Sequence, residues 1–154
     1  MNNAIDDVMR RLAFRYVQSN GSISVSDAEI LKFESIIGLR LPEDYRSFLK
    51  KYGLASGDDG DFIIPEHSTA VEVFYGLAPT TSYDLLRHRK VLADRLPDAY
   101  LAIASSPGGE IVLSLAGQDT GTVYWWNREG RFETTKATQV APNFSALVNT
   151  LAVE

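Results

Sequence analysis

The sequence has 154 residues, of which 45% are hydrophobic and 23% charged, as expected for one globular domain spanning residues 1–154. It contains no cysteine, which excludes disulfides, thiolate catalysis and cysteine-based zinc sites. The formal net charge of −5 disfavours binding to nucleic-acid phosphates and would favour a basic partner, although this charge is also ordinary for a soluble small domain.

The N-terminus gives no sign of export or membrane insertion. Residues 1–7 are polar and acidic, whereas a signal peptide begins with positive charge and an apolar stretch. No run approaches the roughly 18 apolar residues of a membrane span. We therefore expect a cytoplasmic protein that does not contact the membrane.

Helical patterns dominate the N-terminal third. Apolar residues at helical spacing predict a helix over 4–17. Ser26 begins a second helix, and Glu29 three residues later completes a capping box. Gly38 is suited to end this helix because glycine tolerates the left-handed backbone.

A third helix is predicted where Leu41 leads into Pro42. Proline is favoured in the first turn of a helix because its missing N–H would have no partner there. Gly53 ends the helix. One apolar face is predicted to enter the core, and it consists of Tyr45, Phe48, Leu49 and Tyr52.

Most strands are predicted in the middle of the chain, and helices cluster towards its two ends. This order indicates an α+β fold with a mainly antiparallel sheet. A further helix is expected from Ser82 to about Leu96, and Asn143 is expected to cap a terminal helix. The predicted strands are 62–65, 70–75, 100–105, 110–115, 122–127 and 138–140.

Two features surround the strand 110–115. Gly108 and Gly109 precede it and indicate a strand-joining turn, since the spacing of a phosphate-binding loop is absent. In the strand 122–127, alternation places Tyr124 and Trp126 on one face and Trp125 on the other. Either both faces are buried, or a sheet covered on one side leaves an exposed aromatic surface.

An acidic region lies between residues 58 and 72, which contain no Lys or Arg. Its first part, the acidic loop 58–61, is open to three interpretations: a solvated loop, a surface for a basic partner, or a cation site. The spacing is not that of an EF-hand loop, so we expect no metal. His67 lies in this region, but neither it nor any Ser or carboxylate has the spacing of a catalytic group. We therefore expect no enzyme activity and no cofactor.

The Leu-Pro helix and the Gly-Gly strand pair, in this order, resemble the SUKH superfamily and more closely its Smi–Knr branch. The resemblance rests on Leu41, Pro42, Tyr45, Phe48, Leu49, Gly108, Gly109 and Glu110, with Glu110 where the family more often has Asp. It implies a small α+β domain that acts as an immunity protein and blocks a cognate bacterial toxin, often a nuclease. It also allows an alternative, an interaction module in cell-wall regulation or signalling.

These observations lead to one hypothesis for the partner surface. Acidic side chains would steer a basic toxin towards the chain, and exposed aromatic side chains would anchor it. We expect the chain to be a monomer or a weak homodimer. The candidate partner-binding residues are Asp58, Asp59, Asp61, Glu66, Glu72, Tyr124 and Trp126.

Overall fold

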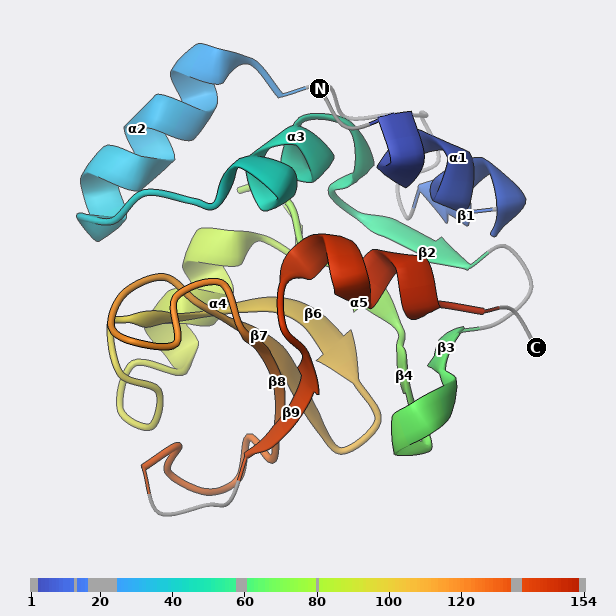
Figure 1. Cartoon of the computed structure of the whole chain (residues 1–154). Coiled ribbons are helices and arrows are strands. Elements are labelled where there is room, and N and C mark those ends of the chain that lie inside the picture. The colour runs from blue at the N-terminus through green and yellow to red at the C-terminus, as the bar shows by residue number, and fades with distance from the viewer. Residues whose placement is uncertain are drawn as a thin grey trace.

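The computed structural model has an α+β fold (Figure 1). It describes residues 3–12, 14–16, 25–57, 61–79, 81–133 and 137–152. The helices are α1 (Asn3–Arg11), α2 (Asp27–Ile37), α3 (Glu43–Tyr52), the short 3-10 helix η1 (Pro65–His67), α4 (Leu85–Val91) and α5 (Phe144–Thr150). The strands are β1 (Phe14–Tyr16), β2 (Ala55–Gly57), β3 (Phe62–Ile64), β4 (Thr69–Val71), β5 (Val73–Phe74), β6 (Tyr100–Ser106), β7 (Gly109–Ser114), β8 (Val123–Trp126) and β9 (Thr138–Ala141).

The main sheet has five antiparallel strands in the order β5-β6-β7-β8-β9. Two smaller antiparallel pairs, β1–β2 and β3–β4, lie beside it. The mainly antiparallel sheet predicted from the sequence is therefore confirmed. None of the helices in the described ranges has the length and apolar character needed to cross a bilayer.

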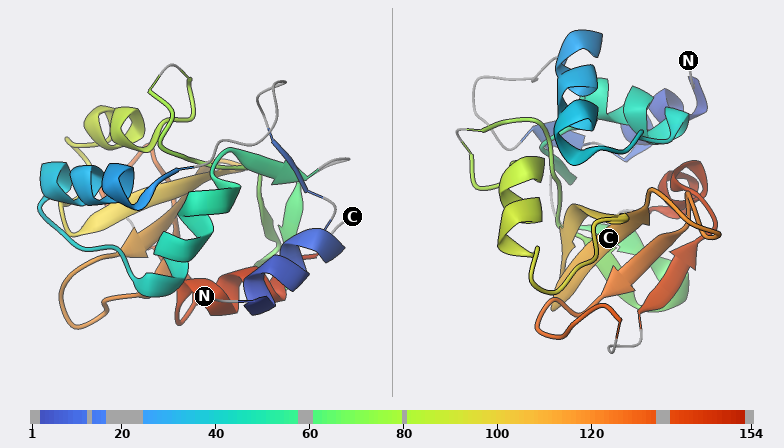
Figure 2. Two further views of the ribbon diagram at one scale, coloured as in Figure 1. Left: turned by 90° about the horizontal axis from the view of Figure 1, so that it is seen from above. Right: turned by 90° about the vertical axis from the view of Figure 1, so that its left-hand side faces the viewer.

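Helices cover both faces of the main sheet, with α4 on one side and α5 on the other (Figure 2). On the α5 side, Phe74 of β5 packs against Phe48 of α3, with ring centroids 4.8 Å apart, and against Phe144 of α5, at 6.3 Å. On the α4 side, His88 stacks on Tyr75 at 3.9 Å. Both faces of the main sheet therefore pack against helices.

The predicted core face of the Leu-Pro helix is confirmed. Helix α3 starts directly after Pro42, and Lys50 and Lys51 occupy its last turn, where cations favour the helix dipole. The buried residues of α3 are Tyr45, Phe48, Leu49 and Tyr52, each at most 4% exposed.

The start and end of α2 also follow the sequence prediction. The Ser26 hydroxyl accepts a hydrogen bond from the Glu29 backbone N–H at 3.2 Å, and the Glu29 side chain accepts from the Ser26 backbone N–H at 3.2 Å. Gly38 ends the helix with a φ of 76°. The backbone groups at each end of α2 find hydrogen-bond partners within the adjacent turn, so both ends could be predicted from local sequence.

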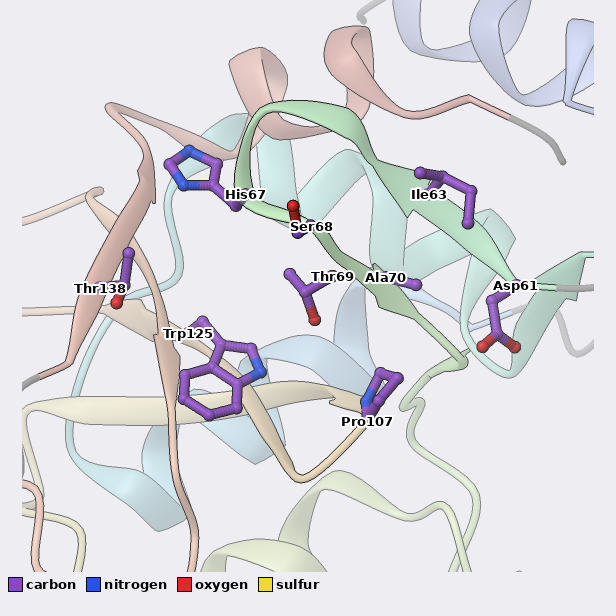
Figure 3. A pocket seen from close by; sticks show the side chains of 9 residues that line it. All are labelled: Asp61, Ile63, His67, Ser68, Thr69, Ala70, Pro107, Trp125 and Thr138. Atoms are coloured by element: carbon purple, nitrogen blue, oxygen red, sulfur yellow. The ribbon is translucent and has the colours of Figure 1, made fainter.

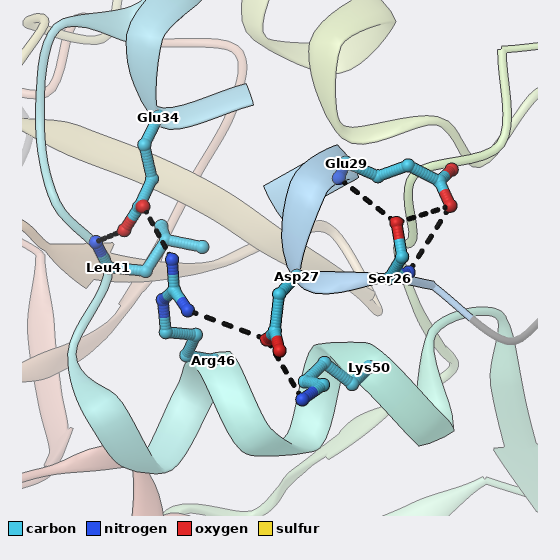
Figure 4. Close-up of polar contacts among 7 residues, drawn as sticks. All are labelled: Ser26, Asp27, Glu29, Glu34, Leu41, Arg46 and Lys50. Carbon is cyan, nitrogen blue, oxygen red and sulfur yellow. Dashed lines mark hydrogen bonds and ion pairs between the residues drawn. The ribbon is translucent and has the colours of Figure 1, made fainter. Parts of the chain in front are cut away.

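A polar cluster holds α2 against α3 (Figure 4). The largely buried Glu34 accepts hydrogen bonds from the Leu41 backbone N–H and from the Arg46 side chain, both at 2.8 Å. Asp27 pairs with Lys50 at 2.9 Å. Burial alone would raise the pKa of Glu34, but the bonds from Arg46 and Leu41 outweigh it and lower that pKa.

The prediction of one helix over 4–17 is wrong at its C-terminal end. Helix α1 stops at Arg11, and Phe14–Tyr16 form β1, which pairs with β2 over Ala55–Gly57. The pairing partner lies about forty residues further along the chain, so the local helical pattern did not reveal it.

Two further elements differ from the prediction. The strand expected over 70–75 is divided at Glu72, so that β4 pairs with β3 whereas β5 joins the main sheet. The helix expected from Ser82 starts at Leu85 because Asp84 is its cap: the Asp84 carboxylate accepts from the Arg87 backbone N–H at 3.0 Å and from the Ala78 N–H at 2.9 Å. It also ends earlier, at Val91.

Candidate functional site

The Gly-Gly pair forms the tight turn between β6 and β7, as predicted. Gly108 has a φ of +74°, a conformation that favours glycine. A side chain at Gly109 would collide with the Trp126 carbonyl oxygen and would lie 2.9 Å from two ring carbons of Trp125. The missing side chain at Gly109 therefore lets the Trp125 indole pack directly onto this turn.

One row of paired residues crosses the main sheet on the α5 side. It runs through Phe74, Ala104, Ile111, Trp125 and Thr138, one from each strand. Phe74, Ala104 and Ile111 are fully buried, whereas Trp125 is partly exposed and Thr138 is exposed. The row thus leaves the core at β8, and Trp125 is its first side chain to reach solvent.

Trp125 lies in an open hollow of about 600 Å³ between the main sheet and the β3–β4 pair (Figure 3). Its lining combines an aromatic ring, hydroxyls, an imidazole and a carboxylate. The lining residues are Asp61, Ile63, His67, Ser68, Thr69, Ala70, Pro107, Trp125 and Thr138.

The β3–β4 pair contributes its outer face to this hollow. Ile63 pairs with Ala70, and both line the hollow together with Asp61, two residues before Ile63. The alternate residues Phe62 and Ile64 are buried in the core. Strand alternation therefore holds the Asp61 carboxylate at the hollow, because the next residue, Phe62, points into the core.

One carboxylate, that of Asp61, lines the hollow. Asp61 forms no ion pair with the residues that the structure describes, and no Lys or Arg lines the hollow. Residues 52–86 contain no Lys or Arg at all. Glu66 is exposed on η1, next to the lining residue His67. Asp58 and Asp59 lie outside the described residues.

Glu72 does not join the hollow. Its carboxylate is close enough to Glu110 to raise the pKa of that residue, and Glu110 pairs with Trp126 on the opposite face of the sheet. Of the acidic residues predicted to form one surface, the structure therefore brings Asp61 to the hollow and places Glu66 beside it.

The prediction that Trp126 is an exposed anchor is wrong. Trp126 is 0% exposed and packs against Phe132, with ring centroids 6.1 Å apart. Tyr124 shares its side of the sheet and is partly exposed, but does not line the hollow. Trp125 is the aromatic residue in the hollow. The sequence predicted which residues share a face, but it could not show which face opens to solvent.

Tyr124 belongs to a polar cluster at the β7–β8 turn. Its hydroxyl donates to Asp119 at 2.7 Å, and the hydroxyls of Tyr100 and Ser114 also donate to Asp119, both at 2.9 Å. Burial acts to raise the pKa of Asp119, but these bonds outweigh it and lower that pKa. Burial and the bond to Asp119 raise the pKa of Tyr124 to about 12. The cluster stabilises the turn.

Glu110, the acidic residue that follows the Gly-Gly pair, is 1% exposed. The Tyr75 hydroxyl donates to it at 2.7 Å, and Arg128 pairs with it at 3.3 Å. Burial raises the pKa of Glu110, and the Tyr75 bond and the Arg128 charge only partly oppose this. All six residues of β7 are buried, and these include the polar residues Glu110 and Ser114.

Arg128 connects Glu110 to the turn itself. Its guanidinium donates to the Ser106 carbonyl at 3.2 Å and to the Gly109 carbonyl at 3.0 Å. The buried carboxylate therefore orients the arginine that holds both ends of the turn beneath Trp125. His88 stacks on the ring of Tyr75, and burial lowers its pKa. His88 is therefore half-buried against the sheet.

The site contains groups suited to binding. In the described ranges, no three His, Cys, Asp or Glu residues are arranged to hold a metal ion. The hollow presents a rigid aromatic ring at one end and a carboxylate at the other (Figure 3). Such a combination suits a ligand with apolar and positively charged parts.

Comparison with known proteins gives two matches. Residues 24–150 match the SMI1 / KNR4 family (SUKH-1), and this range includes α2, α3 and all of the main sheet. The chain is also similar to the SPbeta prophage-derived uncharacterized protein YokK of Bacillus subtilis (strain 168), with 31% identity over 135 residues. That similarity covers 69% of this chain and 64% of the relative, so the chain spans less than two thirds of the relative's length. The chain belongs to the SMI1 / KNR4 family (SUKH-1).

Proposed function

We propose that the chain is a non-catalytic immunity protein that binds and neutralises a cognate bacterial toxin domain, of nuclease type, in the cytoplasm. Membership of the SUKH-1 family supports an immunity-type protein. The partner identity, the nuclease type and the absence of catalysis are parts of the proposal. A nuclease binds phosphates and therefore has a basic active-site surface, which an acidic inhibitor can block.

The observation that carries the proposal is the meeting of Asp61 and Trp125 in one hollow. These residues come from the two segments in which the sequence suggested a partner surface, and they are 64 positions apart. Unpaired carboxylates raise the association rate with a basic protein, and a partly buried aromatic ring slows dissociation of the complex. The hollow therefore has both components of a protein-binding site.

A second candidate function uses the same site. The chain could serve as an interaction module in cell-wall regulation or signalling, since the family includes such proteins. The hollow would then bind a housekeeping protein by the same contacts. The identity of the bound protein distinguishes the two functions.

Affinity capture from the native cell tests the proposal. The unchanged chain, Asp61→Lys and Asp94→Lys would serve as parallel baits, because Asp94 is an exposed acid that follows α4 in the chain and does not line the hollow. We expect the unchanged chain and Asp94→Lys to capture the same basic toxin domain and to inhibit its activity, and Asp61→Lys to capture less. Capture of a housekeeping protein alone would favour the second candidate.

The non-catalytic part of the proposal has its own test. The purified chain is expected to show no hydrolase, nuclease or transferase turnover against standard substrates. Turnover that survives purification and is lost in His67→Ala would contradict it, because His67 is the hollow's only histidine. Light scattering after size exclusion is expected to show a monomer or a weak homodimer.

A further inference from the structure

We propose that the hollow is a groove for an extended segment of the partner protein. An apolar side chain of that segment would lie on the Trp125 indole, and an arginine would pair with Asp61. The inference rests on the proposed function in one respect, namely that the partner is a protein.

The shape of the hollow favours an extended segment over a single side chain. In Figure 3, Trp125, His67 and Thr138 lie at one end and Asp61 lies at the other, with Pro107 and Ala70 between them. The volume of about 600 Å³ is in the range of sites that hold whole ligands of several hundred daltons. An extended chain advances about 3.3–3.6 Å per residue, so a segment of a few residues can contact both ends.

The Trp125 end selects an apolar side chain. The edge of its indole is packed against Gly109, so the ring is held in place before any ligand arrives. The indole N–H is buried and has no hydrogen-bond partner among the described residues, so what the ring presents to the hollow is mainly its apolar surface. A rigid aromatic surface binds apolar or aromatic side chains at little entropic cost.

The Asp61 end selects a cation. Asp61 is partly exposed, has no ion pair with the described residues, and shares the hollow with no Lys or Arg. Arginine fits better than lysine because its planar guanidinium can donate two parallel hydrogen bonds to one carboxylate. The segment is therefore expected to carry an apolar residue and an arginine a few positions apart.

Selection from a phage-displayed library of random peptides, with the full chain as bait, tests this. The selected peptides are expected to be enriched in an apolar or aromatic residue combined with arginine. Their binding would then be measured to Trp125→Ala, to Asp61→Asn and to the control Asp94→Asn, an exposed acid outside the hollow that pairs with Arg95. We expect a loss of roughly thirtyfold for Trp125→Ala, a smaller loss for Asp61→Asn and no change for Asp94→Asn.

Nuclear magnetic resonance locates the bound peptide. The chain has two tryptophans, so two indole N–H signals are expected, and Trp125→Phe assigns them. Addition of a selected peptide should shift the Trp125 signal and leave that of the buried Trp126 in place. Thr138→Arg, which puts a bulky cation at an exposed lining position, should abolish the shift without unfolding the chain.

The inference is overturned if no peptides are selected, if they bind Trp125→Ala as tightly as the unchanged chain, or if they lack basic residues. These failures differ from failure of the proposed function. If the unchanged chain, Trp125→Ala and Thr138→Arg all capture a toxin equally well, the immunity function is supported and the groove proposal is contradicted. Peptides that bind in the groove without any toxin being neutralised would support the groove and contradict the immunity function.

Discussion

Trp125 and Trp126 are neighbours in β8, yet they occupy opposite environments. Trp126 is 0% exposed, on the face of the sheet that also buries Glu110 and contacts Phe132. Trp125 belongs to the other face, is partly exposed and lines an open hollow. One side chain stabilises the fold, and the other is available to a ligand.

Residue type alone therefore does not predict the role of an aromatic residue in a sheet. Strand alternation separates the two indoles, and packing on each face of the sheet decides which one is exposed. Gly109 contacts both residues, and its backbone supports the Trp125 ring. Substitutions at Trp126, Trp125, Gly109, Glu110 and Asp61 test this contrast.

Replacement of Trp126 by alanine should destabilise the fold far more than the same change at Trp125. Loss of a fully buried Trp costs about 3–5 kcal/mol of unfolding free energy, because it removes apolar contacts and leaves a cavity. Trp125 already contacts solvent, so its loss should cost clearly less. Urea denaturation of both variants gives the two values. Equal losses would show that Trp125 is a core residue and would remove the basis of the groove.

Gly109→Ala should destabilise the fold by about 1–3 kcal/mol, the usual cost of inserting a methyl group into a packed site. The added carbon would meet the Trp126 carbonyl and the Trp125 ring, so the turn must shift. The Trp125 indole signal should move as well. Gly121→Ala is a matched comparison, because a carbon added there meets no atom within 4 Å and only its φ of +93° opposes the change. If the Trp125 signal moves equally in both variants, the support from Gly109 is misassigned.

Glu110→Gln should change how stability depends on pH. Because burial raises the pKa of Glu110 in the folded state, its contribution is fully present below the unfolded value near 4.5 and is lost as pH rises through the folded pKa. In Glu110→Gln the side chain does not ionise, so the variant does not lose stability in this way. Its stability relative to the unchanged chain should therefore increase as pH rises across that window.

Unfolding free energies measured from pH 4 to pH 8 test the Glu110 prediction. Glu129→Gln, at an exposed position after β8, is the control and should show a constant difference. A difference for Glu110→Gln that falls with rising pH would mean that Arg128 and Tyr75 outweigh burial.

Asp61→Lys should leave stability within about 0.5 kcal/mol, as is usual for surface changes, while slowing association with a basic partner. The slowing should be strongest at low salt, because ions screen charges beyond about 8 Å at physiological strength. Stopped-flow association at two salt concentrations provides the measurement, with Asp94→Lys as the control. Unchanged association at low salt would mean that the acidic side of the hollow is ordinary solvated surface.

Much of the fold could be predicted because several elements are specified locally. The capping box of Ser26 and Glu29, the stop at Gly38 and the cap at Asn143 all satisfy backbone groups within one turn. Strand β1 and the division of the 70–75 strand could not be predicted in this way. Their formation depends on pairing with residues far along the chain, for which the sequence carries no local signal.

The candidate site was predicted only in part for the same reason. Acidic residues without neighbouring cations pointed to the 58–72 region, and an aromatic run pointed to 122–127. Asp61 was named correctly as part of the later hollow, but Trp126 was chosen where Trp125 lines it. His67 was considered and set aside, because a lone histidine carries no signal until its neighbours in space are known.

The α+β class, the caps of α2 and α5 and the apolar face of α3 followed from the sequence alone. So did the position of Tyr124 and Trp126 on the same side of β8. These features depend on residues within a few positions of each other, where backbone geometry fixes direction. The tertiary structure decided that β7 is buried on both sides, that Glu110 lies under Arg128, and that Trp125 meets Asp61 in a hollow. These features depend on how the helices cover the main sheet and on how the β3–β4 pair packs beside it. Both follow only from packing of the whole chain.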